Sequence, residues 1–189
     1  MKIFKFGGAS VKDAEGVKNV LHVLNTVGHE DVLLVISAMG KTTNALEVVI
    51  KNYFDKSKEL HASLQEVRKY HNQILLDLFE DEEHDVFFDV NAHFDDLEYF
   101  IRSNKSPNYS FVYDQVVSIG ELVSTTIVSH YFNYSGLKNN WIDVRPLIKT
   151  DNNYRDAQVD WETTQKLISK GVKKKTLNIT QGFLGSDEN

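Results

Sequence analysis

The chain has 189 residues, enough for one domain of ordinary size, and its 41% hydrophobic and 25% charged content is typical of a globular protein with a sizeable core. A net charge of −6 argues against nucleic acid or anionic membranes as partners, and no apolar run approaches the roughly 20 residues that span a bilayer. The sequence contains no cysteine, which excludes disulfides and cysteine-ligated zinc and fits a cytoplasmic location.

The first third of the chain predicts a strand, a helix and a second strand. Residues 2–6 predict a buried strand, which a turn of small residues follows. Apolar residues then recur at helical spacing, with Ser10 and Asp13 at the spacing of a capping box and Gly28 as the stop. Residues 32–36 form an uninterrupted apolar strand of the kind found in parallel sheets. This order predicts a βαβ unit.

The remainder of the chain is mainly helical and ends in strands. Helices are expected from about Ala45 and over residues 60–78, 90–101, 112–130 and 161–169, and strands over 140–144 and 176–181. Four strands and about six helices predict an α/β layer architecture. The aromatic residues of the middle helices are expected in the core: Phe87, Phe88, Phe94 and Phe100.

The glycine turn after the first strand is a candidate phosphate site. Gly7 and Gly8 let the backbone approach a ligand, and the helix start behind them offers unpaired N–H groups and the positive end of a dipole. Lys5 is placed to point into the same site. Taken alone, the turn is equally well explained as a purely structural tight turn. A second small-residue turn, with Ser37 and Gly40, favours a ligand site, because ligands bind beyond the carboxyl ends of parallel strands.

The sequence Gly40-Lys41-Thr42 resembles the end of a P-loop, but that motif requires a glycine where Val35 stands. A nucleotide site of the P-loop type is therefore excluded.

Two charged residues are candidate substrate ligands. Glu121 lies in an otherwise apolar helical stretch, where Gly120 and Ser124 leave room beside its carboxylate. A buried carboxylate needs an N–H or cationic partner, such as the ammonium group of an amino acid, whereas an exposed glutamate needs none. Arg155 lies in a polar loop, and its planar fork matches a carboxylate, although most loop arginines are simply solvated. The histidines show no metal-ligand spacing.

Five segments, spread in order over the whole chain, resemble signatures of the aspartate kinases, which belong to the amino acid kinase family. They are Lys5-Phe6-Gly7-Gly8-Ala9-Ser10-Val11, Ser37-Ala38-Met39-Gly40-Lys41-Thr42-Thr43-Asn44, Ser118-Ile119-Gly120-Glu121, the loop from Thr150 to Arg155, and Thr180-Gln181-Gly182-Phe183-Leu184-Gly185. Ala9 stands where the family usually has threonine.

The resemblance implies a three-layer α/β/α sandwich with a mainly parallel sheet, the carbamate kinase-like fold, in truncated form. Residues 1–189 would be its N-terminal, substrate-binding part, without the nucleotide-binding half and the ACT regulatory domains. The implied activity is transfer of the γ-phosphoryl group of ATP, with Mg²⁺, to the β-carboxylate of L-aspartate, in the synthesis of lysine, threonine and methionine. The fragment alone is expected to be inactive, and the enzyme to be a cytoplasmic homo-oligomer.

The resemblance also assigns roles to single residues. Lys5 would be catalytic and bind the phosphates together with Gly7, Gly8 and Ser10. The junction of substrate and phosphate would be lined by Ser37, Gly40 and Thr43, while Glu121 would bind the ammonium group of aspartate and Arg155 its α-carboxylate. No protein ligand for a metal is expected.

Two other functions stay open at this point. One is a related amino acid kinase that acts on glutamate, acetylglutamate or a nucleotide. The other is a non-catalytic substrate-binding or assembly module. An open edge of the sheet would also favour self-association, since unpaired edge strands invite pairing between chains.

Overall fold

A computed structural model describes residues 1–188 of the chain. Its elements, in chain order, are β1 (Lys2–Phe6), a short 3-10 helix η1 (Gly8–Val11), α1 (Ala14–Val27), β2 (Val32–Ile36), α2 (Thr42–Phe54), α3 (Leu60–Leu78), α4 (Asp85–Ser103), α5 (Tyr109–Tyr134), β3 (Asn139–Ile142), α6 (Trp161–Gly171) and β4 (Leu177–Gln181). The predicted strands and helices are thus confirmed, with shifts of a few residues at their ends.

The strands form one parallel sheet in the order β1-β2-β4-β3. Lys5, Val35, Thr180 and Ile142 are paired neighbours and make one row across all four strands. Because all strands run the same way, their carboxyl ends meet at one edge of the sheet, where ligands of such sheets bind.

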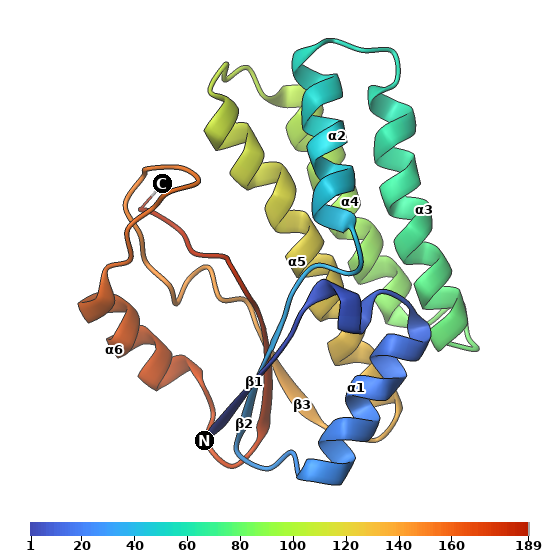
Figure 1. Ribbon diagram of the computed structural model, residues 1–189, viewed down its shortest axis with the longest axis vertical. Helices are drawn as coiled ribbons and strands as arrows, with labels where there is room; N and C mark the ends of the chain where they lie inside the picture. The colour runs from blue at the N-terminus through green and yellow to red at the C-terminus, as the bar shows by residue number, and fades with distance from the viewer. Residues whose placement is uncertain (189) are drawn as a thin grey trace.

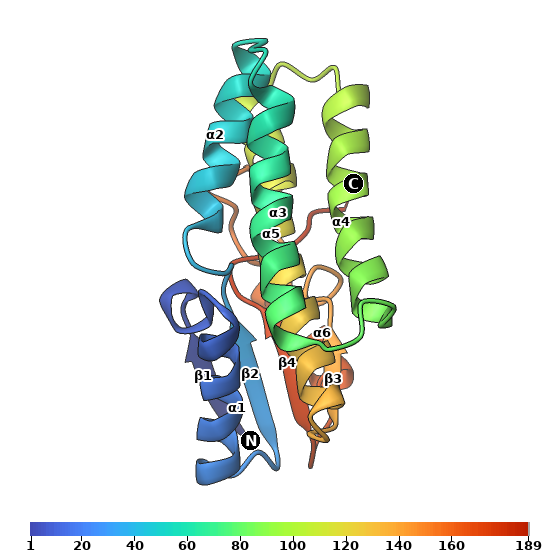
Figure 2. The ribbon, with the colours of Figure 1, turned by 90° about the vertical axis from the view of Figure 1, so that its right-hand side faces the viewer.

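Helices cover the sheet on both faces, which confirms the predicted α/β architecture. Figure 1 shows α6 on one face, and α1 with the second half of α5 on the other. The helices α2, α3, α4 and the first half of α5 form a bundle that projects beyond the carboxyl ends of the strands (Figures 1 and 2). Within residues 1–188, no helix is both long and apolar enough to cross a membrane.

Helix α5 connects the bundle to the sheet. It packs against α2 and α4 in the bundle and against β3 and β4 in the sheet. Its sequence between Val116 and Ser129 is almost entirely apolar or small, and nearly all of these side chains are buried. A helix that is apolar on all sides is stable only when it is surrounded by other elements, so α5 becomes the centre of the molecule.

Some expectations for single residues are wrong. Strand β1 lies at the edge of the sheet, so Ile3 is 68% exposed and the strand is not buried. The cap of α1 is Asp13, whose carboxylate accepts the N–H of Gly16, whereas Ser10 lies in η1. Phe88 is 77% exposed on the outside of α4 rather than in the core, because it lies on the helix face that no other element covers.

Candidate active site

The two glycine turns meet at the carboxyl ends of β1 and β2. The N–H of Gly40 donates to the carbonyl of Gly8 at 2.9 Å. A Cβ atom at Gly8 would lie 2.5 Å from the carbonyl oxygen of Ala38, so only glycine allows this close approach. Gly40 has a φ of +56°, in the left-handed region that favours glycine. The two turns therefore form one connected backbone surface.

Glu121 reaches this surface from α5. Its Oε1 accepts the N–H of Ala38 at 2.9 Å, after β2, and its Oε2 accepts the N–H of Gly182 at 3.2 Å, after β4. The residue is 7% exposed. Burial raises the pKa of the Glu121 carboxyl to about 7, against the two N–H donors and the positive charge of Lys5, which act in the opposite direction. Of the two alternatives that the sequence left open, the structure thus shows the buried carboxylate with N–H partners, at the edge of the sheet.

Small residues of α5 allow the helix to come this close to the strand ends. A Cβ atom at Gly120 would lie 3.0 Å from the methyl group of Thr42 and 3.2 Å from Cβ of Ala38. One turn further, the Ser124 hydroxyl donates to the carbonyl of Ser37 at 2.8 Å. Gly120 and Ser124 therefore fix the depth at which the Glu121 carboxylate sits.

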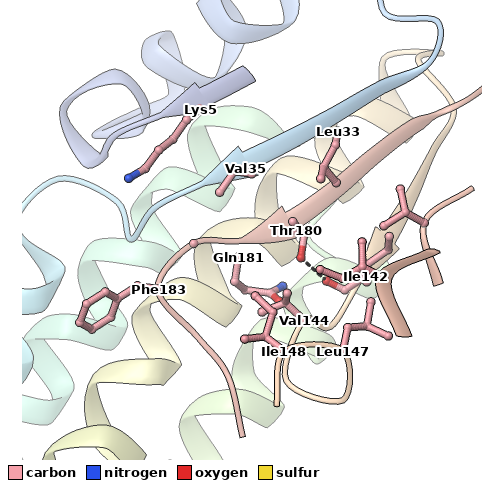
Figure 3. A pocket seen from close by; sticks show the side chains of 13 residues that line it. Lys5, Leu33, Val35, Ile142, Val144, Leu147, Ile148, Thr180, Gln181 and Phe183 are labelled. Carbon is pink, nitrogen blue, oxygen red and sulfur yellow. Dashed lines mark hydrogen bonds between the residues drawn. The ribbon is translucent and has the colours of Figure 1, made fainter. Parts of the chain in front are cut away.

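Lys5 approaches from β1, on the sheet face that carries α6. Figure 3 shows its side chain extending toward the carboxyl ends of the strands, along one side of a pocket of about 300 Å³. The pocket is otherwise mainly apolar, with Val35 and Ile142 on its floor and Phe183 near its rim. Among residues 1–188, Lys5 makes no hydrogen bond or ion pair, so its exposed ammonium group is available to an anion.

The other predicted residues of the turns lie at the same edge. Ser37 follows β2, and its hydroxyl oxygen and Glu121 Oε2 lie 4.0 and 3.7 Å from where a Cβ atom of Gly182 would be. A Cβ atom at Gly182 would thus be in ordinary contact with both groups, so the Gly182 backbone lies directly beside them. Ser10 is exposed in η1, and Thr43 is half-buried in the first turn of α2.

The helix start suited to an anion is that of α2 rather than α1. The carboxylate of Asp13 caps α1 and places a negative charge there. By contrast, no side chain of the described residues caps α2, and Lys41 occupies its N-cap position. An uncapped helix N-terminus presents free N–H groups and a positive dipole end. The phosphate-binding roles of Gly7, Gly8 and Ser10 stay predictions.

Arg155 lies apart from this cluster. Its guanidinium group stacks on the ring of Tyr113, 4.4 Å from the ring centroid, and its backbone N–H donates to the carboxylate of Asp114 at 2.9 Å. Tyr113 precedes Glu121 on α5 by about 12 Å along the helix axis. The structure therefore brings Lys5 and Glu121 to one edge but places the Arg155 side chain against the first turns of α5.

Several residues of this edge had not been assigned a role from the sequence. The backbone N–H of Gly182 donates a hydrogen bond to Glu121. The segment that contains Gly182 is part of the resemblance, but no role had been assigned to this residue. Thr125 accepts a hydrogen bond of 2.7 Å from the side chain of Gln181, which ties β4 to α5. The small-residue turn after β4 was the available signal for Gly182. Nothing in the local pattern around Thr125 or Gln181 indicated their pairing.

A model of the amino acid kinase family matches residues 1–189 of the chain. The chain belongs to this family. Its curated relatives include bifunctional aspartokinase/homoserine dehydrogenase 2 of Escherichia coli, 29% identical over 97% of this chain and 22% of that protein, and the aspartokinase of Chlamydia trachomatis, 25% identical over 97% of this chain and 40% of that protein.

Solved aspartokinase structures show the same fold. Aspartokinase III of Escherichia coli, in complex with lysine and aspartate, superposes with a TM-score of 0.85 at 23% identity, over 100% of this chain and 42% of that one. The structure of the same enzyme in complex with aspartate and ADP superposes with a TM-score of 0.84 at 22% identity. The expected amino acid kinase fold and the aspartokinase relationship are confirmed. The chain spans less than half the length of these relatives.

Proposed function

We propose that this chain is the aspartate-binding part of an aspartate kinase, which transfers the γ-phosphoryl group of ATP to the β-carboxylate of L-aspartate. The aspartokinase relatives support this reaction. The observation that carries the proposal is the Glu121 carboxylate at the carboxyl ends of β2 and β4, with the Lys5 charge acting on it. The product, 4-phospho-L-aspartate, would feed lysine, threonine and methionine synthesis in the cytoplasm, and we expect a homo-oligomer.

Glu121 is the proposed ligand of the aspartate ammonium group. Its carboxylate is buried beside Gly182 and close to the Ser37 hydroxyl. An ammonium group there would stabilise the ionised form, which burial otherwise disfavours. This role favours substrates with a free amino group, such as aspartate or glutamate, over N-acetylglutamate, whose nitrogen carries no charge.

The remaining chemistry is mainly electrostatic. The β-carboxylate of aspartate, with a pKa of about 3.9, is ionised at neutral pH and needs no general base. The difficulty lies in bringing two anions together, so positively charged groups that are already in place lower the barrier. Lys5 would stabilise the charge of the transferring phosphoryl group, while Gly7, Gly8, Ser10, Gly40, Thr43 and the uncapped start of α2 would surround the phosphates.

Mg²⁺ would accompany the nucleotide and bind mainly through phosphate oxygens. Among residues 1–188, no group of three or more histidine, aspartate or glutamate side chains is placed to hold a metal ion. The only carboxylate that we assign to the site, Glu121, already accepts two N–H bonds.

The test is an ATP-dependent aspartyl hydroxamate assay on the complete product of the gene that encodes this chain. Lys5→Ala should lower kcat by at least about 100-fold and leave the KM for aspartate within threefold, because Lys5 acts on the transferring group. Lys2→Ala, on the same strand, is the matched control and should behave as the unmodified protein. Near-normal turnover of Lys5→Ala would remove Lys5 from the catalytic role.

Arg155 requires a separate experiment, because in the structure it stacks on Tyr113. If it leaves Tyr113 to bind the α-carboxylate of aspartate, Arg155→Ala should raise the KM for aspartate about tenfold or more with little change in kcat. Arg102→Ala is the control, since Arg102 also lies over a tyrosine ring, that of Tyr99 in α4, at 5.9 Å from the centroid. An unchanged aspartate titration would show that Arg155 is not a substrate ligand.

A further inference from the structure

Two adjacent residues of α3, Tyr70 and His71, contact the glycine turns from the side of the helix bundle. Neither has a role in the reaction proposed above. Helix α3 lies on the outside of the bundle (Figure 2), yet these two side chains extend to the segments that follow β1 and β2.

Tyr70 joins the end of the first turn to the second turn. Its hydroxyl donates to the carbonyl of Lys12, the residue that ends η1. The same hydroxyl lies against Gly40, where a Cβ atom would be 2.5 Å away from it. One phenol group thus contacts both turns, in addition to the direct hydrogen bond between Gly40 and Gly8.

His71 restrains the start of α2. The side chain is 0% exposed, with Nδ1 2.8 Å from the carbonyl of Val67 and Nε2 3.2 Å from the hydroxyl of Thr42. A carbonyl only accepts, so Nδ1 carries the proton and Nε2 of the neutral ring is an acceptor. The Thr42 hydroxyl has one proton, which it donates mainly to the carbonyl of Met39 at 2.6 Å, with Nε2 as a second, more distant acceptor of the same proton. The hydroxyl therefore lies between the second turn and α3.

We propose that Tyr70 and His71 are positioning residues that set the spacing of the two glycine turns and thereby the geometry in which this edge of the sheet binds phosphate groups. The inference rests on the phosphate role proposed above. Backbone N–H groups stabilise an anion well only when they are already held in the right orientation, because otherwise the ligand must order them at its own cost. Helix α3 supplies this restraint without touching the ligand.

The first experiment removes only the Tyr70 hydroxyl. In the complete gene product, Tyr70→Phe should bind inorganic triphosphate about three- to tenfold more weakly by calorimetry, and raise the KM for ATP by a similar factor. The KM for aspartate should stay within twofold, because the hydrogen bonds of Glu121 are not involved. Tyr99→Phe, at an exposed tyrosine of α4, is the matched control and should change neither value.

Thr42 gives a second test with a conservative rescue. Thr42→Val keeps the shape of the side chain but loses the hydroxyl between Met39 and His71, so triphosphate binding should weaken as in Tyr70→Phe. Thr42→Ser retains the hydroxyl and should restore most of the affinity. If Thr42→Ser loses affinity and Thr42→Val does not, packing of the methyl group rather than the hydrogen bond is responsible, and the proposed role of His71 is refuted.

The contact between Tyr70 and Gly40 can be measured without any ligand. Gly40→Ala places a methyl group against the Tyr70 hydroxyl, whereas in Tyr70→Phe the next atom, Cζ, is 3.4 Å away. The drop in Tm caused by Gly40→Ala should therefore be smaller by about 2 to 4 °C in the Tyr70→Phe background. An equal drop in both backgrounds would refute the contact.

The outcomes separate this proposal from the proposed function. If the unmodified protein does not bind triphosphate, the phosphate role of this edge is wrong, and the positioning role falls with it. If the unmodified protein binds triphosphate and Tyr70→Phe binds it equally well, only the positioning role is overturned. Selective loss of triphosphate affinity, together with the smaller Tm drop, supports the proposal.

Discussion

The buried carboxyl of Glu121 predicts a specific dependence of stability on pH. Its pKa rises from the ordinary value of 4.5 to about 7 in the folded chain. Between these two values the folded state holds a proton that the unfolded state has released. Stability from this group is therefore fully present below pH 4.5 and is lost as the pH rises through about 7. At about 1.4 kcal/mol for each pKa unit, the full loss is about 3 kcal/mol.

The variant Glu121→Gln isolates this effect, because the amide has a similar shape and does not titrate. We expect the free energy of unfolding of the unmodified chain, relative to Glu121→Gln, to be about 3 kcal/mol higher at pH 4.5 than at pH 8.5. Urea denaturation followed by circular dichroism at both pH values measures it, and the comparison at equal pH cancels other titrating groups. Glu66→Gln, at an exposed position of α3, is the control and should show a constant difference. If the free energies of unfolding of the unmodified chain and of Glu121→Gln differ by the same amount at both pH values, the buried carboxyl does not cause the pH dependence.

The same group links aspartate binding to a proton. If the ammonium group of aspartate binds ionised Glu121, complex formation at pH 7 should release about half a proton, since the carboxyl is about half protonated there. Calorimetry in buffers with different ionisation enthalpies measures this release directly. Aspartate that binds without proton release would argue against contact between its ammonium group and Glu121.

Two further predictions concern the glycine turns and α3. Gly8→Ala should lower the free energy of unfolding by about 1 to 3 kcal/mol, because the new Cβ atom meets the carbonyls of Ala38 and Gly40 at 2.5 and 2.9 Å. Gly7→Ala, where a Cβ atom meets nothing within 4 Å, should be nearly neutral, and equal losses would contradict the close approach. Burial lowers the pKa of His71 from 6.5 to about 4, so the unfolded chain binds a proton first as the pH falls and stability decreases over this range by about 3 kcal/mol. His71→Gln should not show this decrease when the free energy of unfolding is measured from about pH 7 to about pH 4. An equal decrease in His71→Gln and in the unmodified protein would disprove the role of His71.

The sequence by itself determined the elements and most of the turn chemistry. Uninterrupted apolar runs predicted parallel strands, and helical periodicity located the helices of the bundle, because both patterns reflect which side chains a local element must bury. Gly8 and Gly40 were recognised as turn residues, since their backbone freedom is a property of the residue itself. Glu121 was recognised as unusual because a charge in an apolar helix needs a partner.

Only the tertiary structure decided which partners these residues find. The N–H groups that hold Glu121 come from Ala38 and Gly182, which are far from it in sequence and meet it only because β2 and β4 are neighbours under α5. The exposure of β1 depends on the strand order, which no local pattern contains. Tyr70 and His71 lie within residues 60–78, where the sequence predicted a helix and no contact with the glycine turns. Their contacts with the glycine turns arise from how closely α3 packs against α2 and α1, which depends on the shapes of all three helices together.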